Sequence, residues 1–179
     1  MPPEMPPEMI VDSHCHLDFP DFDDERSDII ARAVAAGVSR MVTICTKLRQ
    51  EPQVRAIAET YHEVFYAAGT HPMSAAEEPM ATVEQLVALA QHPKFVGIGE
   101  TGLDFCKELS PRADQFEAFE RQVVLALEVR KPLIIHSRDA GNDCLALLQR
   151  MGAAAVGGVF HCYAEDAAFA GKLREINFR

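Results

Sequence analysis

The chain has 179 residues, of which 48% are hydrophobic and 25% charged, a balance typical of a globular protein with one sizeable core. Its formal net charge of −10 excludes a general basic field that attracts nucleic acid, so a polyanionic substrate would need local help from bound cations. Residues 1–8 are Pro-rich and acidic, which predicts a disordered leader and not a signal peptide. No apolar run reaches the roughly 20 residues that span a bilayer, so we expect one domain over residues 9–179 and no membrane partner.

The cysteine usage favours a reducing, cytoplasmic setting. The five cysteines form no C-x-x-C pair, and their odd number does not suggest a disulfide framework. Most of them follow or lie within apolar runs, where cysteine behaves as a small hydrophobic residue.

Apolar runs and helical repeats alternate along the chain. Continuously apolar runs predict buried strands at residues 9–11, 41–45, 64–69, 94–99, 132–135 and 158–160. Apolar residues at helical spacing predict helices at residues 25–36, 50–62, 83–91, 111–129, 143–151 and 164–175. Thr82 and Gln85 are placed as a capping box, and Ser110 with Pro111 as an N-cap and first helical residue. This alternation indicates a parallel sheet covered by helices.

Polar side chains follow most of these predicted strands. Five of the seven histidines and one glutamate directly follow an apolar run: His14, His16, His71, Glu100, His136 and His161. Functional residues at the ends of several parallel strands are the pattern of a TIM-type (β/α)8 barrel. A doubly wound sheet would instead carry a Gly-rich phosphate turn, which the sequence lacks. We therefore predict about the first six β/α units of a barrel, with His62 and His92 in helix-end and loop positions.

Four of these histidines and the glutamate form a candidate metal centre. His14 and His16 share one face of their strand because side chains alternate, so both can hold one divalent ion. Together with His136 and His161 they can bind two ions about 3.5–4 Å apart, with Glu100 as the bridge and catalytic residue. Nitrogen and oxygen donors suit zinc, magnesium or manganese. The competing interpretation is that these are unrelated loop residues.

Five short segments resemble the motifs of the TatD-type metal-dependent deoxyribonucleases, which belong to the amidohydrolase-like β/α barrels. The segments are DSHCHLD (12–18), GTHP (69–72), GETGLD (99–104), HSRDA (136–140) and FHC (160–162). The resemblance implies that His14 and His16 hold a first metal, that Glu100 bridges both metals, and that His136 and His161 complete the second. It also implies cleavage of DNA phosphodiesters, on single strands or from 3′ ends, by water activated between the two cations.

The chain departs from that family in three places. Met73 stands where many relatives carry a second histidine, so we leave His71 out of the predicted ligand set. Tyr163 and its neighbours replace a small, hydroxyl-rich turn. The family also has an aspartate ligand after an eighth strand, in a barrel of typically about 250 residues. We therefore expect two β/α units and that ligand to be missing here, and the open barrel edges to favour self-association.

Two alternatives remain open from the sequence. One is a related barrel hydrolase acting on amides, esters or lactones, although such relatives commonly bridge their metals with a modified lysine and not with a residue such as Glu100. The other is a truncated, catalytically impaired fragment that only binds metal or a partner. Arg138 and Lys107 could add phosphate contacts, although charges of this kind are more often simply solvated.

Overall fold

A computed structural model describes residues 9–179, and the predicted leader at residues 1–8 lies outside the described residues. Its centre is a six-stranded parallel sheet in the order β1-β2-β3-β4-β5-β6. The strands are β1 (Ile10–Cys15), β2 (Val38–Cys45), β3 (Val64–Ala68), β4 (Phe95–Asp104), β5 (Leu133–Arg138) and β6 (Gly158–Phe160). In this sheet each strand pairs with the next strand along the chain, as in a β/α barrel. In a doubly wound sheet the strand order changes direction at a switch point. The predicted fold class is therefore confirmed.

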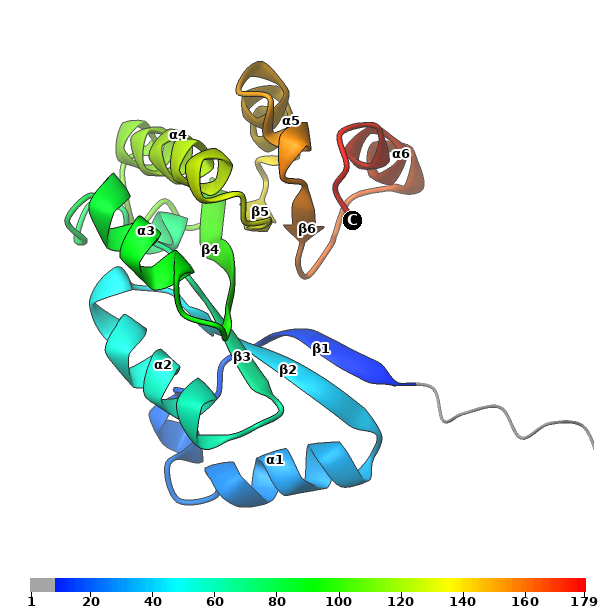
Figure 1. Cartoon of the computed structure of the whole chain (residues 1–179). Helices are drawn as coiled ribbons and strands as arrows, with labels where there is room; N and C mark the ends of the chain where they lie inside the picture. The colour runs from blue at the N-terminus through cyan, green and yellow to red at the C-terminus, as the bar shows by residue number, and fades with distance from the viewer. Residues whose placement is uncertain (1–8) are drawn as a thin grey trace, which may run out of the picture.

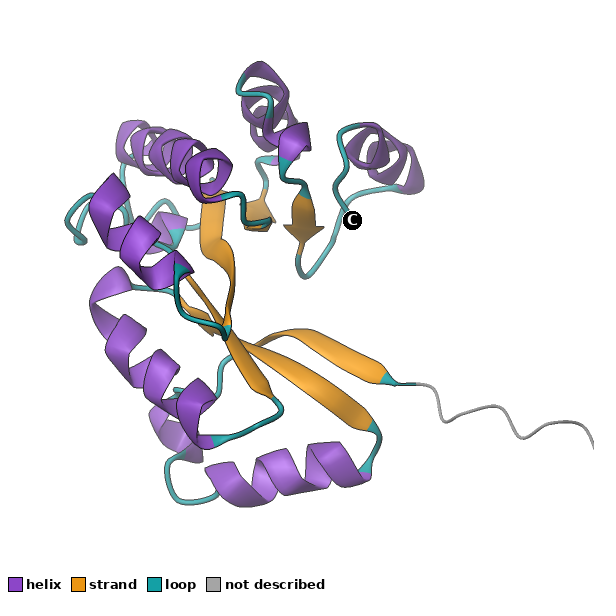
Figure 2. Ribbon diagram, in the orientation of Figure 1, coloured by secondary structure: helices purple, strands orange, loops and turns teal. Residues whose placement is uncertain are grey.

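The α-helices lie on the outer side of the curled sheet (Figures 1 and 2). They are α1 (Arg26–Ala35), α2 (Glu51–Thr60), α3 (Val83–Ala90), α4 (Arg112–Val129), α5 (Gly141–Arg150) and α6 (Ala167–Glu175). Each lies within the range predicted from its apolar spacing or within two residues of it. The predicted capping box is present at α3, where Thr82 Oγ1 accepts from the Gln85 N–H at 3.2 Å and Gln85 Oε1 accepts from the Thr82 N–H at 2.9 Å.

The predicted start of α4 is wrong by one residue. Pro111 is the N-cap, and the Ser110 side chain makes no capping bond. Ser110 Oγ instead donates to the carbonyl of Met73 at 3.0 Å and accepts from the N–H of Ala76 at 3.1 Å. Ser110 thereby ties the loop before α4 to the segment that follows β3, because a buried hydroxyl takes whichever backbone partners its surroundings supply.

Three strands run further at their carboxyl ends than their apolar residues predicted. β4 continues from its apolar part through Glu100 to Asp104, because residues 101–104 pair in register with residues 135–138 of β5. β1 similarly includes His14, and β5 includes His136. Glu100, His14 and His136 therefore project from strands and not from loops, which holds them more rigidly than a loop would.

The main hydrophobic core lies between the sheet and the helices. It contains large, fully buried side chains such as Tyr66, Phe95 and Phe119. A much smaller apolar cluster of Ile44, Ala67 and Ile134 is separate from this core. No helix among residues 9–179 is long and apolar enough to cross a membrane.

The two edges of the sheet differ. Beyond β1, no further strand pairs within the described part of the chain, and Ile10 and Val11 are 52% and 56% exposed. Along β6, the last residues of the chain already begin a further parallel pairing through a bridge between Gly158 and Phe178. The Phe160 N–H also donates to the Arg179 carbonyl at 2.7 Å, so the last residues lie alongside β6 without forming a strand of their own.

Candidate metal centre

Glu100 is the centre of the predicted site. Its side chain is 3% exposed and comes from the middle of β4. Nitrogens of five histidines surround its carboxylate: His14 Nε2 at 3.3 Å, His16 Nε2 at 3.9 Å, His71 Nε2 at 3.5 Å, His136 Nδ1 at 2.9 Å, and His161 Nε2 in a shorter contact. Every residue of the predicted ligand set therefore lies in one cluster, together with His71, which was left out of that set. His62 and His92 instead lie beside Glu63 and Glu59, away from the cluster.

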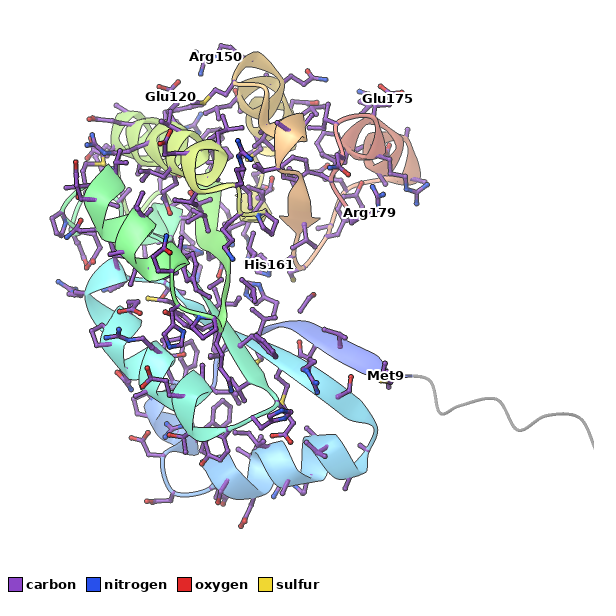
Figure 3. The ribbon with its side chains drawn as sticks, viewed as in Figure 1. Met9, Glu120, Arg150, His161, Glu175 and Arg179 are labelled. Atoms are coloured by element: carbon purple, nitrogen blue, oxygen red, sulfur yellow. The ribbon has the colours of Figure 1, made fainter. Side chains whose placement is uncertain are left out.

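Histidines contact the carboxylate on both of its oxygens. His14 and His16 face Oε2, whereas His71, His136 and His161 face Oε1. Two groups have donor atoms close enough to share an ion, namely His14 with Glu100 and His161, and His71 with Glu100 and His136. The rings of His14 and His161 also stack, with centroids 3.8 Å apart and planes at 6°. Figure 3 labels His161 at the end of β6, on the side away from α4 and α5.

The hydrogen bonds on the far side of each ring decide which nitrogen can bind a cation. His16 Nδ1 donates to the carbonyl of Ile44 at 3.2 Å, which leaves an unprotonated Nε2 towards Glu100. His71 is the reverse case, because its Nδ1 accepts from the Met73 N–H at 3.1 Å. The proton of neutral His71 therefore sits on Nε2 and points at Glu100, so His71 is arranged as a hydrogen-bond donor and not as a ligand.

His136 lies between two carboxylates. Its Nδ1 is 2.9 Å from Glu100 Oε1, and its Nε2 is 3.0 Å from Asp104 Oδ2. Burial alone would lower the pKa of His136, but the bonds to both carboxylates outweigh that effect and raise this pKa above its ordinary value. With both ring nitrogens facing acceptors, only the imidazolium satisfies both, so a cation at Nδ1 would displace one proton and leave the other on Nε2.

Glu100 is held as the anion. Its burial would by itself raise its pKa, because a carboxylate loses hydration in the interior. Hydrogen bonds from four surrounding histidines more than offset this and hold the pKa of Glu100 far below its usual range. A buried anion ringed by nitrogen donors is a centre that cations fit. The buried Nδ1 of His14 has no hydrogen-bond partner among the described residues, unlike Nδ1 of His16.

Asp104 is a site residue to which sequence reasoning assigned no role. It is 1% exposed, and its Oδ1 accepts from the backbone N–H groups of Cys106 at 3.0 Å and Lys107 at 3.1 Å, which leaves Oδ2 for His136. Burial tends to raise the pKa of Asp104, but these bonds lower it overall, so it also stays ionised. Its presence in the quoted GETGLD segment was the available signal.

Two glutamines on α4 hold the strand ends that carry the site. Gln115 Oε1 accepts from the Asp104 N–H at 2.8 Å, and its Nε2 donates to the Asp104 carbonyl at 3.1 Å. Gln122 makes the same pair of bonds to Thr70, at 2.8 Å and 3.0 Å, beside His71. The glutamines are seven residues apart, so they share one face of the helix and reach β4 and the end of β3 together.

A glycine brings β4 and β5 together at the site. Gly102 pairs with His136 and has φ +136°, a backbone conformation that side chains disfavour. A Cβ on Gly102 would lie 2.0 Å from the carbonyl oxygen of His136. The absence of a side chain therefore allows Glu100 and His136 to approach within hydrogen-bond distance.

The cluster opens into a cavity of about 350 Å³. Besides members of the cluster, its walls are formed by Phe19, Thr46, Lys47, Met73 and Ser74. The predicted phosphate contacts Arg138 and Lys107 are exposed and do not line this cavity. Their suggested role therefore has no geometric support, because a phosphate bound at the cluster would be reached first by the residues of the cavity wall.

A known protein family matches almost all of the described residues. Residues 11–178 match the family described as TatD related DNase. The chain is 38% identical to the "Uncharacterized metal-dependent hydrolase YabD" of Bacillus subtilis, over 95% of this chain and 67% of that protein. It is 38% identical to the "3'-5' ssDNA/RNA exonuclease TatD" of Citrobacter koseri, over 78% of this chain and 54% of that protein.

Solved structures show the same fold. The TatD homolog YJJV of Escherichia coli superposes with a TM-score of 0.86 at 28% identity, covering 95% of this chain and 66% of that one. A TatD family hydrolase from Entamoeba histolytica gives a TM-score of 0.84 at 19% identity, covering 95% of this chain and 63% of that one. The chain thus spans roughly half to two thirds of the length of these proteins. Because the match covers almost all of residues 9–179, the chain belongs to the TatD related DNase family.

Proposed function

We propose that this chain is the metal-binding part of a hydrolase that cleaves phosphodiester bonds of single-stranded DNA from the 3′ end. The observation that carries the proposal is the buried Glu100 carboxylate with histidine nitrogens on both of its oxygens. The relative named as a 3'-5' ssDNA/RNA exonuclease supports the choice of substrate. The excess of acidic residues agrees with a site that depends on cations to attract a polyanion.

The proposed ligands are those expected from the sequence. His14 and His16 lie on the Oε2 side of Glu100, and His136 and His161 on the Oε1 side. Divalent cations held there would activate water and neutralise the charge that develops on the phosphate. In this arrangement His71 contributes the Nε2–H described above, which can hold Glu100 in place or donate to a phosphate oxygen.

The alternative class of amide, ester or lactone hydrolase has less support. Its members commonly bridge two metals with a modified lysine, whereas the bridging position here is Glu100, and Lys47 on the cavity wall is paired with Glu77 at 3.2 Å. A fragment that binds metal without turnover remains a distinct hypothesis. Among the described residues, Glu100 and Asp104 are the carboxylates hydrogen-bonded to the ring of His136, and both are already engaged there.

The test compares this chain with a version extended by the C-terminal third of a homologous TatD protein. Both are incubated with single-stranded DNA labelled at its 5′ end, in Mg²⁺, Mn²⁺ or Zn²⁺, and products are sized by electrophoresis. We expect products that shorten stepwise from the 3′ end, about 10²- to 10⁴-fold faster with the extended chain, because a general base contributes about that factor.

Glu100→Ala in the extended chain should abolish cleavage, because cations held at the cluster would lose its central carboxylate. Glu78→Gln is the matched control, since Glu78 is also a buried carboxylate but pairs with Arg49 at 3.0 Å, outside the cluster. Cleavage that survives Glu100→Ala would overturn the proposal. So would an extended, folded, metal-loaded chain that hydrolyses an ester or lactone and leaves DNA intact.

A further inference from the structure

Phe19 is a large apolar side chain left exposed at the wall of the metal centre. It is 43% exposed and lines the same cavity as His16, Glu100, His136 and His161. Its ring stacks on that of His16, with centroids 4.9 Å apart and planes at 15°. A phenyl ring held flat against a proposed ligand, with part of its surface still accessible, is a surface on which another flat group can stack.

The backbone on both sides of Phe19 is anchored. The N–H of Leu17 donates to Thr43 Oγ1 at 3.1 Å, and the carbonyl of Leu17 accepts from Arg26 Nε at 2.6 Å. The carbonyl of Phe19 itself accepts from the N–H of Phe22 at 3.0 Å. The exposure of this ring is therefore a property of an ordered segment, and a ligand that stacks on it need not order the loop first.

The charges near the cavity favour recognition through stacking. Lys47 is the basic residue on the cavity wall within the described part of the chain, and its Nζ lies 3.2 Å from Glu77 Oε2. The whole chain carries a net charge of −10. Bound cations aside, the cavity wall therefore offers little positive charge for contacts to the phosphates of a DNA strand. Stacking of a base on an aromatic ring needs no charge and accepts every base.

We propose that Phe19 is a stacking platform for one nucleobase of a single-stranded DNA substrate, beside the phosphodiester bond held at the Glu100 cluster. This inference rests on the proposed function and adds the recognition element. It predicts a preference for single strands over duplexes, because a base in a duplex is already stacked and paired. The cavity of about 350 Å³ lies within the roughly 300–1,000 Å³ of small-ligand sites, which suits one nucleotide.

The first test uses fluorescence. The chain contains no tryptophan, so Phe19→Trp introduces a single reporter at the proposed platform. We expect oligothymidylate to quench this emission in Ca²⁺ buffer, where the oligonucleotide is checked to be intact, and an equally long abasic oligonucleotide to quench it far less. Val124→Trp is the matched control, because Val124 is 50% exposed but lies on α4 and not on the cavity wall. Its emission should not respond.

The second test measures affinity by fluorescence anisotropy of labelled oligothymidylate. Phe19→Leu keeps an apolar side chain without the ring and should weaken binding roughly five- to a hundredfold, the range of one base–aromatic stack. Binding of the abasic oligonucleotide should be unchanged. If Phe19→Leu binds oligothymidylate as well as the parent chain does, the stacking role of Phe19 is refuted and the proposed function is unaffected. If neither the parent chain nor the extended chain binds or cleaves any oligonucleotide, the stacking role and the proposed nuclease function are both refuted.

Discussion

Asp104 Oδ2 accepts a hydrogen bond from His136 Nε2 at 3.0 Å, on the side of the imidazole opposite Glu100. The carboxylate thereby selects the proton position of the ring. With Nε2 protonated, Nδ1 is the nitrogen available to a cation. This contact joins residues 32 positions apart in the sequence and determines how one proposed ligand is presented.

Asp104→Asn should weaken binding of Mn²⁺ about 10- to 100-fold, the usual effect of removing a carboxylate that orients a metal-bound histidine. The asparagine can place its NH₂ group against Nε2 and favour the wrong tautomer. Calorimetric titration gives the affinity, and nitrogen NMR of labelled histidine gives the tautomer of His136. Asp143→Asn on the exposed surface of α5 is the control. An unchanged His136 spectrum in Asp104→Asn would contradict this role.

Separate substitutions should distinguish His16, a proposed metal ligand, from His71, a hydrogen-bond donor to Glu100. His16→Ala removes an unprotonated nitrogen that faces Glu100 and should lower metal affinity. His71→Ala removes an N–H donor, so metal affinity should change little while cleavage by the extended chain falls. Both are measured by metal titration and by DNA cleavage at saturating metal. Equal loss of metal binding in the two variants would place His71 among the ligands.

Gln122→Leu should destabilise the fold. The substitution leaves the buried N–H and carbonyl of Thr70 without the side chain that pairs with both. Each buried group left unpaired costs about 1–3 kcal/mol, so the free energy of unfolding should fall by at least that amount. Urea denaturation followed by circular dichroism measures it. Gln149→Leu, at an exposed position on α5, is the control and should unfold within about 0.5 kcal/mol of the parent.

Stability and metal binding should depend on pH in opposite directions. The pKa of His136 is raised in the folded chain, so its contacts to Glu100 and Asp104 stabilise the metal-free protein fully below about pH 6.5, the ordinary histidine value. That contribution is lost as the pH rises through the higher, folded-state value. A cation competes with the same proton, so affinity for Mn²⁺ should increase over this interval. Thermal melts and metal titrations at a series of pH values between 6 and 9 test both trends. A metal affinity that does not change with pH would contradict proton displacement.

The bare edge of β1 should promote self-association. Ile10 and Val11 are more than half exposed along a strand whose outer edge has no partner in the described residues. We expect this chain to form oligomers at micromolar concentration in light scattering coupled to size exclusion. Val11→Lys, which places a charge on that edge, should shift the population towards monomer. A monodisperse monomer of the parent chain at high concentration would contradict this expectation.

Periodicity in the sequence was enough to predict the strands, the helices and most members of the candidate site. Continuous apolar runs and helical repeats located all six strands and six helices, because burial on both faces of a parallel strand leaves a pattern that needs no knowledge of tertiary contacts. The same pattern predicted His14, His16, Glu100, His136 and His161 to follow strands directly, although Glu100, His14 and His136 lie within the longer strands of the structure. Since parallel strands align their carboxyl ends, these residues were expected to lie together at the C-terminal face of the barrel. The predicted cluster is therefore a consequence of order along the chain.

Only the tertiary structure decided the finer roles. Asp104 and Gln115 are ordinary polar residues in sequence, and their function arises from partners that folding brings to within about 3 Å. The proton position on His71 depends on a backbone N–H two residues away, through a turn whose geometry the sequence did not predict. Ser110 bonds across to the segment after β3 instead of capping α4. Hydrogen bonds of this kind are directional and depend on distances of tenths of an ångström, whereas apolar burial depends mainly on which face a side chain occupies.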